Sequence, residues 1–373
     1  MLTLPVFYIL LVVMPPLLFF FYAFIYEKGE IADLPIAIWD ESHSPVSREL
    51  TFLLEQMESI HITRQIDHQA DLQELMLKGE VMGAVHFPRK MDENILSGQP
   101  VTITLYTNAS SLVPAKLLYR NASDVILTGG AGIILERLVQ TGMNREKAMA
   151  LVQPIRLSTF PLYNPTYNYF RYLVPGLITV ALQMILIMTG VLLINHERKT
   201  GTLSELLALA KRSAFRILLG KLIAHLIFAW LSFILVVGIL FPLFGIAQPA
   251  ATLHFFILYT LLALACISIG LCLSVIVSDP MLASDIALFY TAPAFVFRGY
   301  TFPRWAMPWY DQYYAWLMPY SFFLDGFIKL YQMQLPYPYA LRESAILLLF
   351  VLIAFPLAWM LLHRKIRKEK FVL

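Results

Sequence analysis

The segment NHERKTGTLSELLALAKRSAFRILLGK, residues 195–221, decides how this chain folds. It is short, basic and amphipathic, and it lies between two apolar segments, residues 170–194 and 222–244. A helix needs about 20 consecutive apolar residues to cross a bilayer core. We therefore expect two membrane-spanning helices joined by a polar loop at one membrane face.

The composition indicates an integral membrane protein. The 373 residues are 58% hydrophobic and 14% charged, with a mean hydropathy of +0.66, whereas soluble domains carry roughly a quarter charged residues. The formal net charge of +3 is too small to indicate nucleic-acid binding. The two cysteines, Cys266 and Cys272, share one apolar segment, which indicates neither a disulfide framework nor a metal site.

Six transmembrane helices are predicted. Residues 1–26 carry no charge and form the first span, because a secretory signal would have a basic start, a shorter apolar run and a small-residue cleavage pattern. With the two spans that flank the central loop, the set is completed by residues 253–277, 281–297 and 344–362. The spans after residue 169 form a five-helix transmembrane domain, residues 169–373.

The basic residues set the expected orientation. They concentrate in the loop 196–221 and in the C-terminal tail, and such residues are retained in the cytoplasm. An even number of spans then places the N-terminus in the cytoplasm as well. The expected location is a bacterial inner membrane.

Residues 27–168 predict a mixed α/β domain on the opposite, extracytoplasmic side. From residue 28 onward they hold 12 basic and 16 acidic residues, and their periodicity alternates between strand and helix. Strands are expected at 34–39, 60–66, 81–87 and 101–106, and helices at 45–57, 67–78 and 91–96, with a final helical stretch from Ser111 that is interrupted by Gly129, Gly130 and Gly132. Ser44 and Pro45 fit the N-cap and first position of a helix.

Enzymatic motifs are absent from the sequence. The histidines are scattered without HExxH spacing, and there is no Gly-x-Ser-x-Gly motif. Asp40, Glu41 and His43 lie close together, which a solvated turn explains better than a catalytic or metal site. There is no phosphate-binding P-loop either, because Leu222 follows Gly220-Lys221 where Ser or Thr is required.

The central loop predicts an amphipathic helix over residues 197–212. Thr202 and Glu205 fit a capping box, in which the hydroxyl and the carboxylate satisfy the free N–H groups of a helix start. Gly201 permits a sharp turn before it. Leu203, Leu206, Leu207 and Leu209 then form an apolar stripe beside basic residues, typical of a helix at the membrane interface. A simple connector on the headgroups is the alternative.

Residues 289–339 form a broken aromatic region. Its 51 residues include 19 aromatics and six prolines, and irregular backbone at membrane depth needs protein or a water-filled cavity to cover it. We therefore expect re-entrant half-helices near the outer face, although an aromatic belt at the headgroups is an equal alternative. Arg298 is expected at the interface or paired with Asp311 or Asp325. Gln183, His225 and Asp285 are expected to make hydrogen bonds between helices.

Three stretches resemble ABC-2 type exporter permeases of the multidrug branch, which carry a large extracytoplasmic domain after the first helix. They are HERKTGTLSELL followed by LLGK, then RGYTFPRWAMPWYDQYYAWLMPYSFFLDGF, and LPIAIWDESHSPVSREL at residues 34–50. The resemblance implies that residues 197–212 form the coupling helix that docks on an ATP-binding subunit, through Glu197, Arg198, Gly201, Thr202, Leu203, Glu205 and Leu206. It implies an outer re-entrant gate over residues 299–331, with Arg298, Gly299, Phe302, Pro303, Pro308, Pro319, Asp325 and Gly326.

The chain departs from the family pattern at three places. It begins almost inside the membrane, whereas family members begin with an amphipathic helix, so that helix is either truncated or absent. Ala210-Lys211 replaces the usual Thr-Pro after the coupling helix, and Met318 stands where Asn often precedes Pro319.

The resemblance implies an exporter of amphiphilic or drug-like substrates. ATP and Mg are expected on a partner ATP-binding subunit, with no cofactor on this chain. Six spans form half a pore, so a second permease subunit is expected, as a homo- or heterodimer, together with the lipid membrane and an adaptor protein in the periplasm. Two alternatives remain: export of a glycan or lipid-linked substrate, and a membrane-anchored sensor that uses its extracytoplasmic domain.

Overall fold

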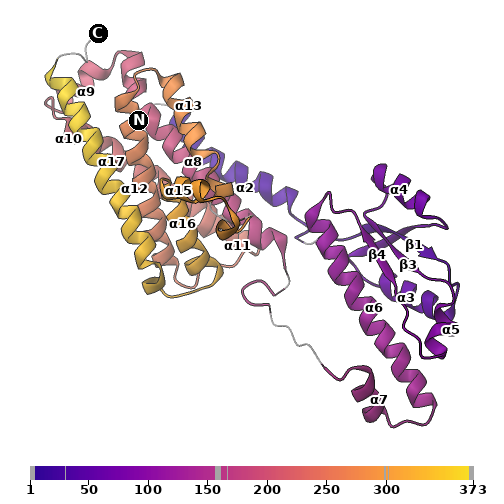
Figure 1. Cartoon of the computed structure of the whole chain (residues 1–373). Coiled ribbons are helices and arrows are strands. Elements are labelled where there is room, and N and C mark those ends of the chain that lie inside the picture. Colours follow the sequence, from indigo (N-terminus) through magenta and orange to yellow (C-terminus); the bar gives the residue numbers. More distant parts are fainter. Residues whose placement is uncertain are drawn as a thin grey trace. The chain divides into compact units, whose positions relative to one another are not determined.

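A computed structural model describes residues 5–29, 31–155, 161–165, 167–297, 300 and 302–368. The chain forms two compact units, one from Met1–Gly29 with Pro161–Leu373 and the other from Glu30–Phe160 (Figure 1). The first unit is a bundle of helices, and the second is a four-stranded sheet with its own helices.

The α/β unit is built on a mixed sheet with the order β2-β1-β3-β4. Strand β1 (Leu34–Asp40) pairs in parallel with β2 (Ile60–Gln65) and β3 (Gly83–Phe87), and β4 (Thr104–Thr107) pairs antiparallel with β3. The strands lie where the sequence pattern predicts them, because alternating side chains on β1 face two separate apolar cores. Ile36 belongs to one core and Ala37 to the other.

Helices cover both faces of this sheet. α3 (Pro45–Glu55) and α6 (Leu112–Gln140) pack in the larger core, and α4 (Gln69–Leu77) packs in the smaller one. α5 (Met91–Leu96) and α7 (Arg145–Val152) complete the unit. Ser44 caps α3 and exchanges hydrogen bonds with Ser47 in a capping box, which confirms the predicted helix start.

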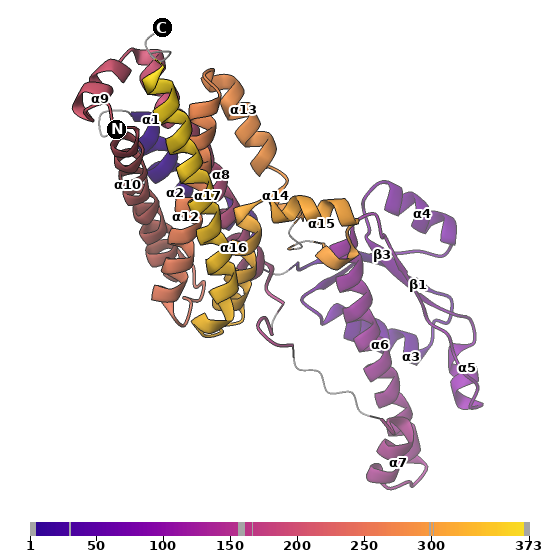
Figure 2. The same cartoon turned by 60° about the vertical axis from the view of Figure 1, so that its left-hand side comes forward.

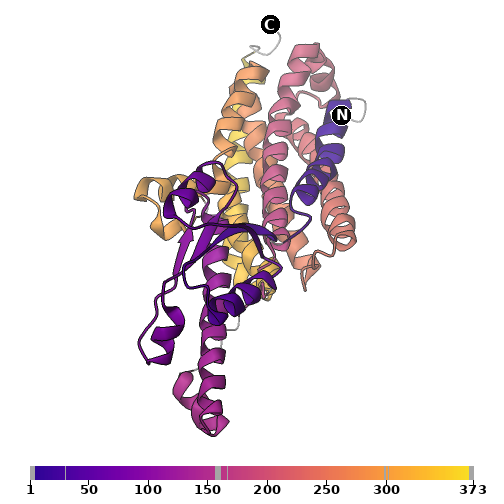
Figure 3. The same cartoon turned by 90° about the vertical axis from the view of Figure 1, so that its right-hand side faces the viewer.

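The predicted interruption of the last helix was wrong. α6 runs without a break through Gly129, Gly130 and Gly132, and it extends well past the sheet (Figure 3). Gly129 has a packing reason, since a Cβ there would lie 2.9 Å from side-chain atoms of Leu50 and Leu53 on α3. The glycine therefore allows close contact between two helices and does not end one.

Four helices of the described bundle are long and apolar enough to cross a membrane. They are α8 (Tyr169–Thr200), α10 (Ala214–Phe233) with its continuation to Leu243, α12 (Thr252–Ile276) and α17 (Leu341–Arg367). They run side by side in Figures 1 and 2. The N-terminal helix, α2 (Met14–Ile25) preceded by a π-helical turn η1 (Ile9–Val13), packs on α8 and is shorter.

The span predicted at residues 281–297 is divided. α13 (Pro280–Thr291) ends before Pro293, and the four-residue α14 (Ala294–Phe297) follows. Proline lacks a donor and disfavours helical backbone in the residue before it, so it breaks the helix there. Short helices then continue the chain, chiefly α15 (Trp309–Trp316) and α16 (Pro319–Phe327).

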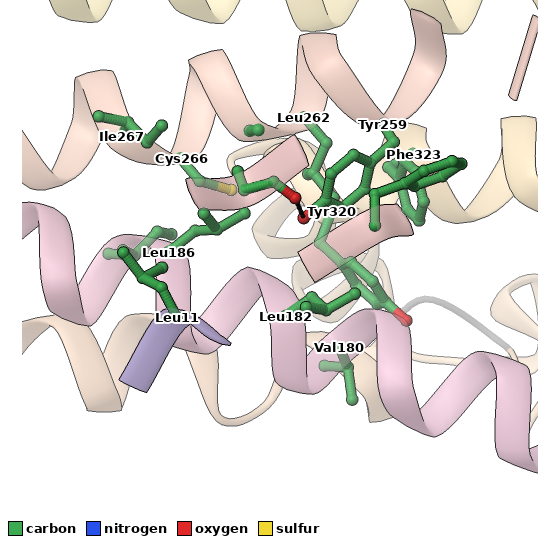
Figure 4. Close-up of a cluster of buried hydrophobic side chains, with 14 of the residues drawn as sticks. Leu11, Val180, Leu182, Leu186, Tyr259, Leu262, Cys266, Ile267, Tyr320 and Phe323 are labelled. Atoms are coloured by element: carbon green, nitrogen blue, oxygen red, sulfur yellow. Dashed lines mark hydrogen bonds between the residues drawn. The ribbon is translucent and has the colours of Figure 1, made fainter. Parts of the chain in front are cut away.

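α8 and α12 cross at close range within the bundle. Gly190 and Gly270 face each other, and a Cβ on Gly270 would lie 2.7 Å from the carbonyl oxygen of Ile187 and 2.8 Å from the Gly190 Cα. Small residues allow such close backbone approach between membrane helices. Further along the same helices, Leu182 of α8, Tyr259 of α12 and Tyr320 of α16 pack in one apolar core (Figure 4).

Candidate functional site

The candidate coupling helix is shorter than predicted. Residues 197–200 are still the end of α8, and the separate helix α9 covers only Leu203–Leu209. Gly201 joins the two helices in the left-handed conformation, with φ +75°, which glycine adopts without steric cost. α9 lies at the same end of the bundle as the C-terminal end of α17 (Figure 2).

The leucines of α9 are divided between a face that is buried against the bundle and a face that is exposed. Leu203 and Leu207 are each 6% exposed and pack into the bundle core, and Leu206 is partly buried against it. Leu209 is 84% exposed, and Glu205, one turn earlier, is exposed too. Side chains four residues apart share one helix face. α9 is therefore fixed to the bundle by one face and presents Glu205 and Leu209 on another.

Glu197 is the centre of a polar contact that holds α9 in place. Its carboxylate forms an ion pair with Lys221 of α10, and the two side chains are only 15% and 10% exposed. The Thr202 hydroxyl donates a hydrogen bond to the same carboxylate. Three segments, the end of α8, the start of α9 and the first turns of α10, thus meet at one carboxylate.

The predicted capping box of Thr202 and Glu205 was wrong. Thr202 occupies the N-cap position, but its side chain makes no capping hydrogen bond. The physical reason is orientation, because the Thr202 side chain is turned to donate to the Glu197 carboxylate, a charge-assisted hydrogen bond, and its oxygen accepts from no backbone N–H of α9. Glu205 is left facing away from the bundle.

Arg198 connects α8 to α12. Its guanidinium donates to Asn195 Oδ1 at 3.1 Å and to the Ser274 carbonyl oxygen at 3.3 Å. The Ser274 hydroxyl oxygen in turn accepts from the backbone N–H groups of Ile194 and Asn195, each at 3.1 Å. Arg198 is therefore placed to hold two helix ends together, beside the contact made by Glu197.

A second polar contact lies one turn deeper in the bundle. His225 is fully buried, and its Nε2 lies 2.7 Å from the Thr189 hydroxyl on α8. This is the hydrogen bond between helices that the sequence predicted. Gln183 is buried as well, but its Oε1 has no hydrogen-bond partner among the described residues, so the bond between helices predicted for it is not found there. Asp285 on α13 is exposed, so the prediction of an interior contact for Asp285 was wrong.

The candidate gate residues are spread along the segment after α14. Phe302 is 52% exposed, Pro303 and Pro308 precede η3 (Arg304–Ala306) and α15, and Pro319 begins α16. Asp325 and Gly326 lie on α16, where Gly326 permits close contact with Leu258 of α12. Arg298 and Gly299 lie outside the described residues.

A tyrosine pair that the sequence did not reveal joins this region to α8. The rings of Tyr172 and Tyr300 stack at 4.7 Å with a 4° angle between them, and each hydroxyl donates to the backbone carbonyl of the other residue. Gln332 donates to the Tyr300 hydroxyl at 2.8 Å. Gly176 leaves space for this ring, because a Cβ there would lie 2.6 Å from it. The two tyrosines are 128 residues apart, and no local sequence pattern relates residues at that separation, so the sequence held no signal for this pair.

Comparison with known proteins identifies the family. The sequence model of the ABC-2 family transporter proteins matches residues 5–360. The chain belongs to the ABC-2 transporter family. This confirms the resemblance drawn from the three stretches, and it makes the protein a permease subunit of an ABC transporter, embedded in a membrane and working with an ATP-binding partner.

Two curated relatives are also ABC transporter permeases by name. The chain is 23% identical over 300 residues to the probable multidrug ABC transporter permease YbhR of Escherichia coli strain K12, and equally to that of E. coli O157:H7. The alignment covers 79% of this chain and 77% of the relative. No solved structure matches the chain.

Proposed function

We propose that this permease exports amphiphilic or drug-like molecules, driven by ATP hydrolysis on a separate subunit. Membership of the ABC-2 family and the similarity to a protein named as a probable multidrug permease support the direction and the substrate class. ATP and Mg bind to the partner subunit in this proposal, and this chain supplies no cofactor site. The observation that carries the proposal is the carboxylate of Glu197, which ties α9 to both α8 and α10.

The proposal assigns two roles to the residues of the coupling segment. Glu205 and Leu209 form the docking face for the ATP-binding subunit, since they are exposed while the other face of α9 is packed. Glu197, Arg198 and Thr202 transmit force, because they bond to segments on three helices. Leu203 and Leu206 anchor α9, and Gly201 forms the bend between the helices.

The proposed topology has six spans, with both termini in the cytoplasm of a bacterial cell and the α/β unit outside its inner membrane. The N-terminal helix and the divided segment of α13 and α14 supply the two spans that are shorter than the other four. A second permease subunit completes the pore. The α/β unit, residues 27–168 in the predicted boundaries, contacts a periplasmic adaptor. The proline-broken segment after α14 forms the outer gate.

The docking face can be tested by co-purification. The permease is isolated from its native membranes in mild detergent, and mass spectrometry identifies an associated ATP-binding subunit. Leu209→Ser removes the most exposed apolar side chain of α9, and it is expected to reduce the recovered ATP-binding subunit at least several-fold. Interface hot spots are commonly worth about 2 kcal/mol or more, roughly thirtyfold in affinity.

Leu253→Ser is the matched control. Leu253 is 67% exposed at the start of α12, at the opposite end of the bundle from α9, because the end of α12 at Ser274 meets the end of α8. This variant is expected to recover the partner at the level of the unmodified chain. If no ATP-binding subunit accompanies the unmodified chain even after cross-linking, or if both variants behave alike, the docking proposal is wrong.

A further inference from the structure

A charged pocket lies between α16, α17 and η3. Its volume is about 300 Å³, and its walls include Arg304, Asp325, Arg342 and Glu343 together with aromatic and aliphatic side chains. It lies beside the first four turns of α17. The other end of α17 is near α9, since Lys365 donates to the Val275 carbonyl oxygen at the end of α12. The pocket is therefore at the end of the bundle away from the coupling segment.

Two arginines of this pocket form no ion pair with any residue that the structure describes. Within the part of the chain that the structure describes, neither Arg304 nor Arg342 has a carboxylate within ion-pair distance. A guanidinium presents five N–H donors in a planar fork that matches phosphate oxygens. Two such groups lining one pocket favour a phosphate as the anionic part of a ligand.

One negative group of the pocket has an unused acceptor. Glu343 is only 4% exposed, and one of its carboxylate oxygens accepts from Lys329 at 2.8 Å. The other oxygen, Oε2, is buried and has no hydrogen-bond partner among the described residues. Leaving a buried acceptor unsatisfied is costly, so a donor from a ligand would be stabilised at this position. Asp325 adds a second carboxylate to the same pocket.

The remaining wall of the pocket is apolar and faces outward from the bundle. Leu349 is 52% exposed and Ile353 is 59% exposed, one turn apart on α17. Only 22% of the apolar window of α17 is buried, so most of the apolar surface of this helix is left uncovered by the rest of the described chain. A ligand in this pocket can therefore keep its polar part among the charges and its apolar part along α17.

We propose that this pocket binds a membrane lipid whose headgroup carries both an ammonium and a phosphate, as the phosphoethanolamine headgroup does. The ammonium donates to the free oxygen of Glu343, and the phosphate accepts from Arg304 and Arg342. The acyl chains lie along Leu349 and Ile353. The bound lipid is a resident component and not cargo, so the proposal stands independently of the substrate and of ATP-driven transport.

Lipid binding to the full chain tests this proposal. The protein is purified in mild detergent, depleted of lipid and titrated with phosphatidylethanolamine, phosphatidylcholine or phosphatidylglycerol, and occupancy is read by native mass spectrometry. Phosphatidylethanolamine is expected to bind about tenfold tighter than the other two, because one lacks N–H donors and the other lacks an ammonium. One charge-assisted hydrogen bond accounts for such a factor. Soluble phosphoethanolamine is expected not to bind, since it has no acyl chains.

Two variants with little risk of misfolding locate the site. Arg342→Gln removes an exposed guanidinium that forms no ion pair in the described structure, and Leu349→Trp fills the pocket. Each is expected to weaken phosphatidylethanolamine binding at least tenfold. Leu348→Trp is the matched control, because Leu348 is 44% exposed on α17 but does not line the pocket. Its affinity should equal that of the unmodified chain.

Several results would overturn the proposal. Equal binding of phosphatidylglycerol would mean a simple anion site, and equal binding of phosphatidylcholine would remove the role of Glu343. Binding of soluble phosphoethanolamine as tight as that of the lipid would exclude the acyl contacts. Unchanged binding in both Arg342→Gln and Leu349→Trp would place the lipid elsewhere.

Discussion

Removing one partner of the ion pair between Glu197 and Lys221 should strongly destabilise the end of the bundle that carries α9. Both side chains are largely buried, and removing one partner of a buried pair leaves an uncompensated charge, at a cost of about 3 kcal/mol. For a unit of this size, 1 kcal/mol lowers the melting temperature by roughly 2–4 °C. Glu197→Ala and Lys221→Met should therefore each lower it by about 6–12 °C. The double variant should lose much less than the two single losses together.

A thiol-reactive dye gives a specific assay for this prediction. The chain has two cysteines, Cys266 and Cys272, and both are buried in α12. Neither lies in the α/β unit, so dye labelling during heating reports the unfolding of the bundle. Glu205→Ala is the matched control, because Glu205 is exposed on α9. Such a surface change typically costs within about 0.5 kcal/mol, or about 2 °C or less.

The results that would refute this reasoning are specific. If Glu197→Ala melts within 2 °C of the unmodified bundle, Glu197 is not buried with its partner. If the losses of Glu197→Ala and Lys221→Met simply add in the double variant, the two side chains do not interact. In either case the coupling segment would be held by its apolar contacts alone.

Other substitutions follow from the packing and the caps. Gly270→Ala should lower the free energy of unfolding of the bundle by about 1–3 kcal/mol in the same dye assay, since the new Cβ would overlap backbone atoms of α8. Gly220 has open space around it, so Gly220→Ala should stabilise α10 by up to about 1 kcal/mol. Gly201→Ala should cost about 1 kcal/mol because of its positive φ, seen as a lower melting temperature of the bundle. Ser47→Ala should cost about 1 kcal/mol through the lost 2.7 Å hydrogen bond to Asp40, measured as faster proteolysis of the α/β unit. A Ser47→Ala chain with unchanged proteolysis, or a Gly270→Ala bundle as stable as the Gly220→Ala bundle, would contradict these estimates.

Local patterns in the sequence predicted much of the secondary structure of the α/β unit. The strands and short helices of the α/β unit follow from alternation, from the Ser44-Pro45 start and from Gly79, which ends α4 with φ +72°. The glycines of α6 were misread, because the sequence does not show that Gly129 meets α3. A glycine that ends a helix and one that permits close packing look the same without the partner helix.

The coupling segment shows a different limit. The sequence predicted the bend at Gly201, a helix after it and the apolar stripe of that helix. It did not predict the partners of Glu197, since Lys221 is 24 residues away and pairs of this kind have no fixed spacing. One signal was present in the sequence: Lys221 stands among apolar residues, between ILLG and LIAH. A lone charge at the edge of an apolar helix requires a partner, but the loop offers two acids, Glu197 and Glu205, and the sequence does not show which of them pairs with Lys221.

In the coupling role proposed for α9, the position of this pair determines how a force on α9 would reach the bundle. Lys221 and His225 lie one turn apart on α10 and bond to Glu197 and Thr189, which lie two turns apart on α8. Because the two helices are joined by side-chain contacts at two different heights, α8 and α10 cannot rotate independently at this end. The Gly190 to Gly270 crossing holds α8 against α12 at the same level. We expect a force on α9 to move α8, α10 and α12 together as one rigid body. Conformational change within the unit would then be concentrated in the proline-broken segment beyond α13.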